Sequence, residues 1–141
     1  MVSSAPKLNV YQLHLVGNVL CVEMNNVWSK ATSKKALAEA QELVADIKGE
    51  PWAALVNIRN WIMPTLEALD DFQYIYDWCA ANNQTHEVTL CRFDTQKHII
   101  GDVSNYDGEH QLYTQSPEDA SNWLVEKGFN FSLKEWQQLT R

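Results

Sequence analysis

The chain has 141 residues, of which 45% are hydrophobic, and this length and composition fit one domain with a sizeable core. Its formal net charge of −7 at pH 7 argues against binding to nucleic acid or to an anionic membrane surface, because both attract basic proteins. No apolar run is long enough for a membrane span, and the opening segment MVSSAPKLNV lacks the apolar stretch of a signal peptide. Cys21, Cys79 and Cys91 follow neither a disulfide nor a zinc pattern, so we expect a cytoplasmic protein with reduced thiols.

The first predicted element is a β-hairpin. Residues 8–15 alternate between two strand faces, and a short apolar run follows over 19–24. Gly17 and Asn18 lie between the two arms, and glycine adopts the positive φ of a tight turn without steric cost.

A helix is predicted next, over 33–48. Ser33 is a candidate N-cap, although the helix can also begin one turn earlier, and Gly49 is the expected stop. The lysine-rich start opposes the helix dipole, and we interpret it as a solvated face or as a contact for an acidic partner. Apolar residues recur at three- and four-residue spacing and form one face: Ala36, Leu37, Ala40, Leu43, Val44 and Ile47.

A central strand and a second helix follow, and the residues between them are the main functional candidates. The run WAALVNI, residues 52–58, reads as a strand covered on both faces. The helix begins near Pro64, which suits position N1 or N′. Segment 59–63 is therefore predicted to be a strand-to-helix junction, a common location for functional residues in α/β folds.

The next part of the chain alternates again between strands and a short helix. HEVTLCRF, residues 86–93, reads as a strand, and residues 97–103 show a short helical pattern followed by loop signals. QLYT, residues 111–114, reads as a short strand at an edge of the sheet.

The C-terminal part is predicted to be two helices. Ser116 and Pro117 are placed as N-cap and N1 of the first, and Gly128 as its stop. The tail 130–141 is a short amphipathic extension capped by Ser132 that docks on the domain or on a partner.

The predicted order β-β-α-β-α-β-(α)-β-α-(α) implies an α/β fold. It consists of a mixed, mostly parallel sheet of about five strands with an N-terminal hairpin and helices packed against it. We interpret residues 1–141 as one domain, with a core over about 8–129.

Three stretches, GEPWAALVNIRNW, the junction into PTLEAL, and YTQSPEDASNWLVEKGF, resemble a known family in their order and spacing. They are similar to the STAS domains of bacterial anti-sigma-factor antagonists and, more closely, to the SpoIIAA-like family grouped with CRAL-TRIO lipid-transfer domains. The resemblance covers most of the chain from Leu8 to Phe129. It implies a SpoIIAA-like fold and a non-enzymatic regulatory or ligand-binding module.

The resemblance also implies where a phosphorylation switch would lie. In the anti-sigma antagonists, a serine in an Asp-Ser-Ser-Gly turn before the equivalent helix is phosphorylated by a partner kinase. Residues 62–65 here read Ile-Met-Pro-Thr, and Asn57 stands where those proteins often carry an aspartate. Thr65 is the one hydroxyl at this junction, and we expect it to cap the helix rather than to be modified.

Catalytic and metal-binding patterns are missing from the sequence. It contains no GxSxG, GxGxxG, P-loop or HExxH motif, so we expect no enzyme, no cofactor and no metal site. His98 and His110 flank an acidic stretch over 94–110, which we interpret as a solvated loop. We expect His86 to be exposed.

Aromatic side chains give the second helix an apolar flank beyond its core stripe. Tyr74 and Trp78 lie four residues apart, and they fit either a homodimer contact or packing against the segment that contains Trp136. The predicted interaction or ligand surface consists of Arg59, Asn60, Trp61, Ile62, Met63, Thr65, Tyr74 and Trp78.

Two functions fit this surface. The first is a STAS-like regulatory module that binds a protein partner or itself. The second is a carrier or sensor of a small apolar, lipid-like ligand, with a cavity of a few hundred Å³ between the second helix and the sheet. If neither applies, the apolar side chains of 61–63 are a plug that closes the site.

Overall fold

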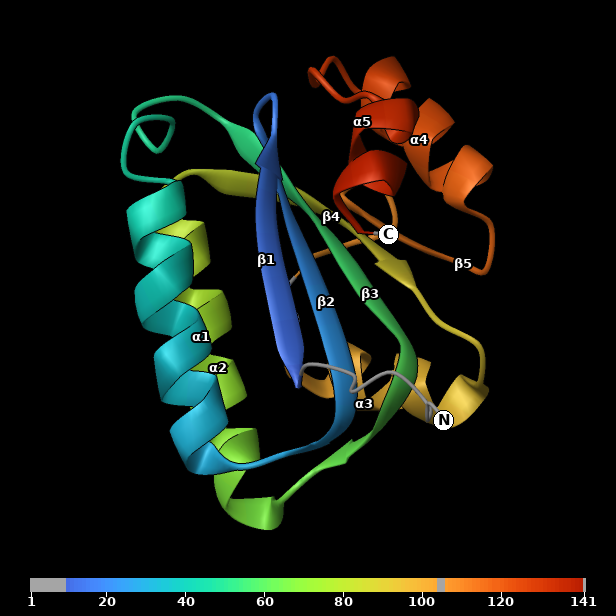
Figure 1. The fold of residues 1–141 in the computed structure, drawn as a ribbon. Helices are drawn as coiled ribbons and strands as arrows, with labels where there is room; N and C mark the ends of the chain where they lie inside the picture. Colours follow the sequence, from blue (N-terminus) through green and yellow to red (C-terminus); the bar gives the residue numbers. More distant parts are fainter. Residues whose placement is uncertain (1–9, 104–105, 141) are drawn as a thin grey trace, which may run out of the picture.

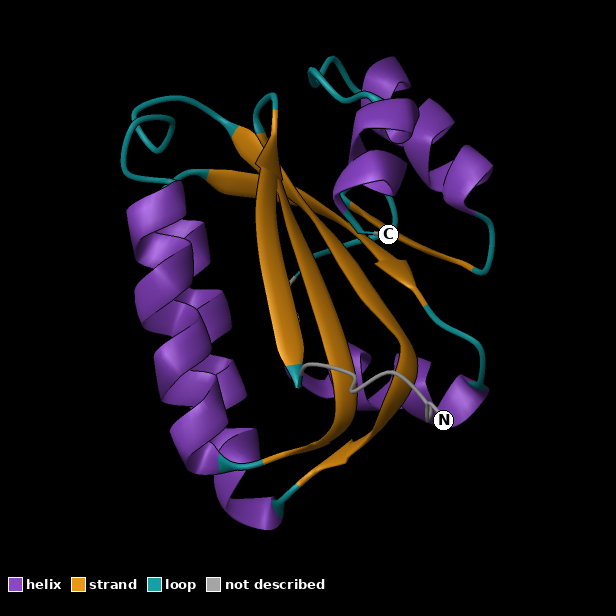
Figure 2. Ribbon diagram, in the orientation of Figure 1, coloured by secondary structure: helices purple, strands orange, loops and turns teal. Residues whose placement is uncertain are grey.

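The computed structural model describes residues 10–103 and 106–140, apart from the side chains of Met63, Leu66 and Val103. It contains one five-stranded sheet in the order β1-β2-β3-β4-β5, in which β1 is antiparallel to β2 and the remaining neighbours are parallel (Figures 1 and 2). The strands are β1 (Tyr11–Val16), β2 (Val19–Trp28), β3 (Trp52–Pro64), β4 (Gln84–Leu90) and β5 (Gln111–Thr114). The helices are α1 (Lys30–Leu43), α2 (Leu66–Ala81), α3 (Asp94–Val103), α4 (Pro117–Glu126) and α5 (Leu133–Leu139).

Helices cover both faces of the sheet. Figure 1 shows α1 and α2 side by side on one face, with α4 and α5 on the other. The alternation of side chains along β3 divides the core accordingly, because successive residues of a strand point to opposite faces. Ala53 and Leu55 pack with α4 and α5, whereas Ala54 and Val56 pack on the side of α1 and α2. The predicted α/β fold with its N-terminal hairpin is confirmed.

The central strand is longer than the sequence predicts. β3 continues through 59–63 to Pro64, because the long strand β2 supplies backbone partners along this stretch, from Asn25 opposite Asn60 to Trp28 opposite Pro64. The expected strand-to-helix junction is therefore wrong: these residues are an irregular continuation of the sheet. The polar Asn60 and the proline concealed this from the sequence pattern.

The boundaries of α1 also differ from those predicted. Ser29 is its N-cap and accepts a hydrogen bond from the backbone N–H of Thr32, while Ser33 is buried within the helix. The helix ends at Leu43, and residues 44–49 form turns, so Gly49 is not the stop.

The predicted caps of the other helices are confirmed. Thr65, Ser116 and Ser132 accept hydrogen bonds from the third residue after them, which satisfies an N–H that a helix start leaves without a partner. Gly128 has φ of +94° at the end of α4, and Gly17 has φ of +60° in the hairpin turn.

The C-terminal part packs on the face opposite α2. Trp136 is buried with residues of α4 and β1, so of the two alternatives for Tyr74 and Trp78, packing against Trp136 is wrong. His86 is half-buried rather than exposed, because its ring packs against His110, Trp123 and Phe129.

Among the described residues, no helix combines the length and the apolar character that crossing a membrane requires.

Candidate functional site

The carboxyl ends of β2, β3 and β4 form one edge of the sheet, because the three strands are parallel neighbours. Open parallel sheets commonly bind their ligands at this edge. Three large apolar side chains are exposed here: Val27 near the end of β2 (47%), Ile62 near the end of β3 (64%) and Phe93 just after β4 (59%). We call Val27, Ile62 and Phe93 the edge patch.

A β-bulge turns Ile62 outward. Trp61 pairs with Asn26 and Met63 pairs with Val27, so Ile62 is an extra residue in β3. The ring of Trp61 points inward and lies 5.6 Å from the ring of Phe72.

The exposure of Trp61 is only 2%, so it belongs to the core. The expectation that the ring of Trp61 contributes to a contact surface is therefore wrong. The ring closes the site, as in the alternative interpretation of 61–63, and the neighbouring Ile62 is the exposed residue.

Gln96 of α3 holds the edge together. Its side chain is buried and donates to the backbone oxygens of Ile58 (2.7 Å) and Trp61 (2.9 Å). Its oxygen accepts from the backbone N–H groups of Arg92 (2.7 Å) and Phe93 (3.1 Å). One amide therefore places the loop that carries Phe93 against the bulge that carries Ile62. Gln96 is not recognisable from the sequence, since a glutamine in a polar helix has no distinctive local pattern.

Two arginines lie beside the edge patch. Burial lowers the pKa of Arg59, the nearby guanidinium of Arg92 lowers that pKa further, and the carboxylate of Glu23 partly opposes both effects. Asn57 holds Arg59 in place by accepting from its Nε at 3.0 Å. Within 10–103 and 106–140, neither arginine forms an ion pair. A chain of net charge −7 thus concentrates two cations next to its exposed apolar residues.

The other predicted site residues separate into different surroundings. Asn60 is exposed on β3, and Thr65 is half-buried and caps α2 through an Oγ1 that accepts from the backbone N–H of Ala68 at 3.3 Å. Tyr74 is 60% exposed and faces α1, while Trp78 is half-buried with Lys48 at 6.0 Å from its ring. The predicted surface is therefore not one contiguous patch.

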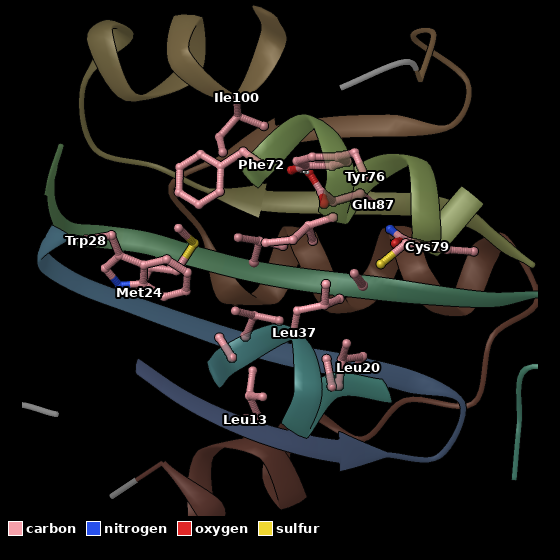
Figure 3. A pocket seen from close by; sticks show the side chains of 17 residues that line it. Leu13, Leu20, Met24, Trp28, Leu37, Phe72, Tyr76, Cys79, Glu87 and Ile100 are labelled. Atoms are coloured by element: carbon pink, nitrogen blue, oxygen red, sulfur yellow. Dashed lines mark hydrogen bonds between the residues drawn. The ribbon is translucent and has the colours of Figure 1, made fainter. Parts of the chain in front are cut away.

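A second candidate site is an apolar cavity of about 80 Å³ between the sheet and helices α1 and α2 (Figure 3). Leu20 and Ala54 of the sheet, with Ala36 of α1 and Phe72 of α2, are among its lining residues. It was expected near 61–63 with a volume of a few hundred Å³. Neither Trp61 nor Ile62 lines it, and it is too small for a lipid.

A buried carboxylate, Glu87 of β4, borders the cavity and was not anticipated. Figure 3 shows it beside Tyr76, whose hydroxyl donates to Oε2 at 2.8 Å. Thr89 and Gln111 donate to the same oxygen at 3.0 and 3.1 Å. Burial raises the pKa of Glu87, and these donors partly oppose that rise. The available signal was a charged residue in the middle of an otherwise apolar strand.

The cysteines show little sign of chemical activity. All three are free and buried. Cys79 lines the cavity, where burial raises its pKa to about 12 and keeps the thiol protonated. Among the described residues, no group of histidine, cysteine and acidic side chains is arranged to hold a metal ion.

Comparison with known proteins identifies the type of fold. No protein-family model and no curated protein matches the chain. A solved structure of an uncharacterized protein of the DUF3478 family from Shewanella loihica PV-4, with a SpoIIAA-like fold, aligns with a TM-score of 0.64 over 86% of this chain and 99% of that one. The unphosphorylated anti-sigma factor antagonist SpoIIAA aligns with a TM-score of 0.58 over 82% of this chain and 97% of that one.

The chain has a SpoIIAA-like fold. The identities are 12% and 8%, so the likeness establishes the fold and leaves the activity to be argued from this chain's own residues. Thr65 caps α2 at the place where the resemblance implies a phosphorylated serine, and it lies three residues after Ile62 of the edge patch.

Proposed function

We propose that the chain is a non-enzymatic regulatory module of the cytoplasm that binds a protein partner, or a second copy of itself, through the edge patch and the adjacent Arg59 and Arg92. The observation that carries the proposal is the exposure of Val27, Ile62 and Phe93 at one edge of the sheet. Apolar side chains that group together on a surface are typical of a contact with another protein.

The two arginines indicate the chemistry of the partner segment. Neither guanidinium forms an ion pair within the described residues, so each can pair with a carboxylate on another chain. Such pairs are strongest when the contact excludes water. We therefore expect a segment that offers apolar side chains to Ile62 and Phe93, and carboxylates to Arg59 and Arg92. A second copy can also supply carboxylates, since the chain carries 18 acidic residues.

Native mass spectrometry tests self-association directly. The expected result is a dimer for the wild type, a monomer for Ile62→Asp and a dimer for Val125→Asp. Val125 is the matched control, because it is 55% exposed but lies on α4. A wild type that stays monomeric at micromolar concentration contradicts the homodimer, and a dimer that survives Ile62→Asp excludes the edge patch as its contact.

Quantitative affinity capture with the same three proteins tests binding to a partner. A partner bound through the edge patch is recovered with the wild type and with Val125→Asp, and is depleted with Ile62→Asp. Recovery of the same proteins in equal amounts with all three rules out the edge patch as the contact. Circular dichroism of each variant checks that the fold is retained.

A second candidate function, the binding of a small apolar ligand, is favoured by the cavity beside Glu87. Its volume of about 80 Å³ suits a molecule of a few heavy atoms. Benzene is a suitable probe: we expect it to raise the Tm of the wild type but not of Ala54→Val, which fills part of the cavity. An equal shift in both proteins would contradict a ligand site there.

A further inference from the structure

A groove of about 490 Å³ lies between α1 and α2, and none of the three edge-patch residues lines it. Figure 1 shows the two helices side by side. Leu37 and Ile75 line both this groove and the apolar cavity, so they form the wall between the two. The cavity has a mainly apolar lining, whereas the groove is also lined by charged and hydroxyl groups from both helices.

Helical spacing brings the groove residues together. Lys30, Ser33 and Leu37 lie three and four residues apart along one face of α1, with Lys34 beside them. On α2, Asp71 and Tyr74 face them from the other side. Two unexplained features of the chain therefore lie at this groove. They are the lysine-rich start of α1, which opposes the helix dipole, and the ring of Tyr74, which is 60% exposed.

Two buried polar atoms lining the groove lack a hydrogen-bond partner among the described residues. They are Oγ of Ser33, whose residue is fully buried, and Oδ2 of Asp71. An unsatisfied buried oxygen destabilises the fold, so folded proteins nearly always give such atoms a partner. Two residues with such atoms, on two helices, line the same groove. Both oxygens are closed to solvent in this structure, so a bound molecule supplies their partners once the two side chains rotate toward the groove.

We propose that this groove binds a small zwitterion of the amino-acid type. Its ammonium group donates to the carboxylate of Asp71 and to the hydroxyl oxygen of Ser33. Its carboxylate pairs with Lys30 and Lys34, and its apolar body lies against Leu37 and the ring of Tyr74. Charge complementarity selects this class. An anion without an ammonium group leaves Asp71 unpaired and repelled, while a simple amine leaves the lysines unused.

Three probes that differ by one group test this assignment. L-leucine carries both charges, N-acetyl-L-leucine lacks the ammonium group, and L-leucinamide lacks the carboxylate. Titration of the ¹⁵N-labelled protein, followed by backbone amide shifts in α1 and α2, gives the Kd of each. We expect L-leucine to bind, and each of the other two to bind at least about tenfold more weakly, since each forfeits a charge-assisted hydrogen bond.

Matched variants assign the contacts to residues. Asp71→Asn is expected to weaken L-leucine binding by at least about tenfold. Asp77→Asn, an exposed acid further along α2, leaves the Kd unchanged. Ser33→Ala weakens binding while the helix is retained, because alanine is the best helix former.

The possible results separate clearly. The proposal is overturned if L-leucine shifts no amide at millimolar concentration, if the three probes bind equally, or if Asp71→Asn and Asp77→Asn have the same Kd. An increase in Tm for Ser33→Ala and Asp71→Asn without any L-leucine binding also overturns it, since it shows that the two oxygens only destabilise the fold. Ile62→Asp leaves this binding unchanged, so the groove and the edge patch fail or succeed independently.

Discussion

Replacing Gln96 with alanine tests whether a single amide organises the carboxyl edge of the sheet. Gln96 is 3% exposed, and its side chain makes four hydrogen bonds to backbone groups of β3 and of the loop before α3. Gln96→Ala removes all four and leaves two carbonyls and two N–H groups without these partners.

The expected loss is about 3 kcal/mol. Each hydrogen bond contributes roughly 0.5–1.5 kcal/mol net, and the sum is reduced because water reaches the loop N–H groups of Arg92 and Phe93 more readily than the oxygens of Ile58 and Trp61. For a chain of this size, such a loss lowers Tm by roughly 10 °C. Because native stabilities are typically about 5–15 kcal/mol, the variant still folds.

Urea denaturation followed by tryptophan fluorescence measures this loss, and Gln137→Ala, an exposed glutamine of α5, is the control. Gln96→Glu keeps the acceptor but loses the donor, so it reports on the two β3 oxygens separately. The reasoning is refuted if Gln96→Ala costs less than about 1 kcal/mol at an unchanged m-value. In the same variant, we expect partner binding at the edge patch to weaken, since the position of Phe93 is released.

Three further predictions concern the rest of the fold. Burial raises the pKa of Glu87, so the stability that its protonated side chain contributes is complete below the ordinary glutamate pKa and is lost as pH rises through the raised pKa. In paired urea titrations, the free energy of unfolding of Glu87→Gln should therefore rise relative to that of the wild type between about pH 4 and pH 7. A difference between the two proteins that stays constant with pH would contradict this. Burial lowers the pKa of His86, and the neighbouring His110 lowers it further. The stability that neutral His86 contributes is therefore present above the ordinary histidine pKa and is lost as pH falls through the lowered pKa. Between about pH 7 and pH 5, the free energy of unfolding of the wild type should fall more steeply than that of His86→Phe, and equal slopes of the two against pH would refute the assignment. Gly17→Ala should cost at least about 2 kcal/mol by urea denaturation, because φ is +60° and the new Cβ meets a backbone carbonyl of the α4–α5 loop, whereas Gly49→Ala meets open space and should cost little.

Local patterns were sufficient for the class of the fold. The alternation of the hairpin, the apolar run of β3 and the caps at Thr65, Ser116 and Ser132 act within a few residues, so they can be recognised without knowing the partners. The order of strands and helices then restricts the topology, because parallel crossovers are almost always right-handed.

The candidate site was predicted only in part. Ile62 is exposed as expected, whereas the ring of Trp61, its neighbour, is buried against Phe72. The difference comes from a β-bulge between β2 and β3, and a bulge depends on the register of two strands that are far apart in sequence. Gln96 and Glu87 were missed because some of the partners that bury them are distant in sequence: 35 and 38 residues away for Gln96, and 11 and 24 residues away for Glu87.

The sequence by itself determined the α/β class, the kinds of element and most helix starts, because these follow from periodicity and capping over a few residues. The tertiary structure alone decided which residues of the segment 56–71 are accessible. β2 extends the central strand through that segment, the bulge presents Ile62 and buries Trp61, and Gln96 brings Phe93 alongside. The groove between α1 and α2 likewise exists only once two crossovers have placed the helices side by side, since exposure is a property of packing and not of residue type.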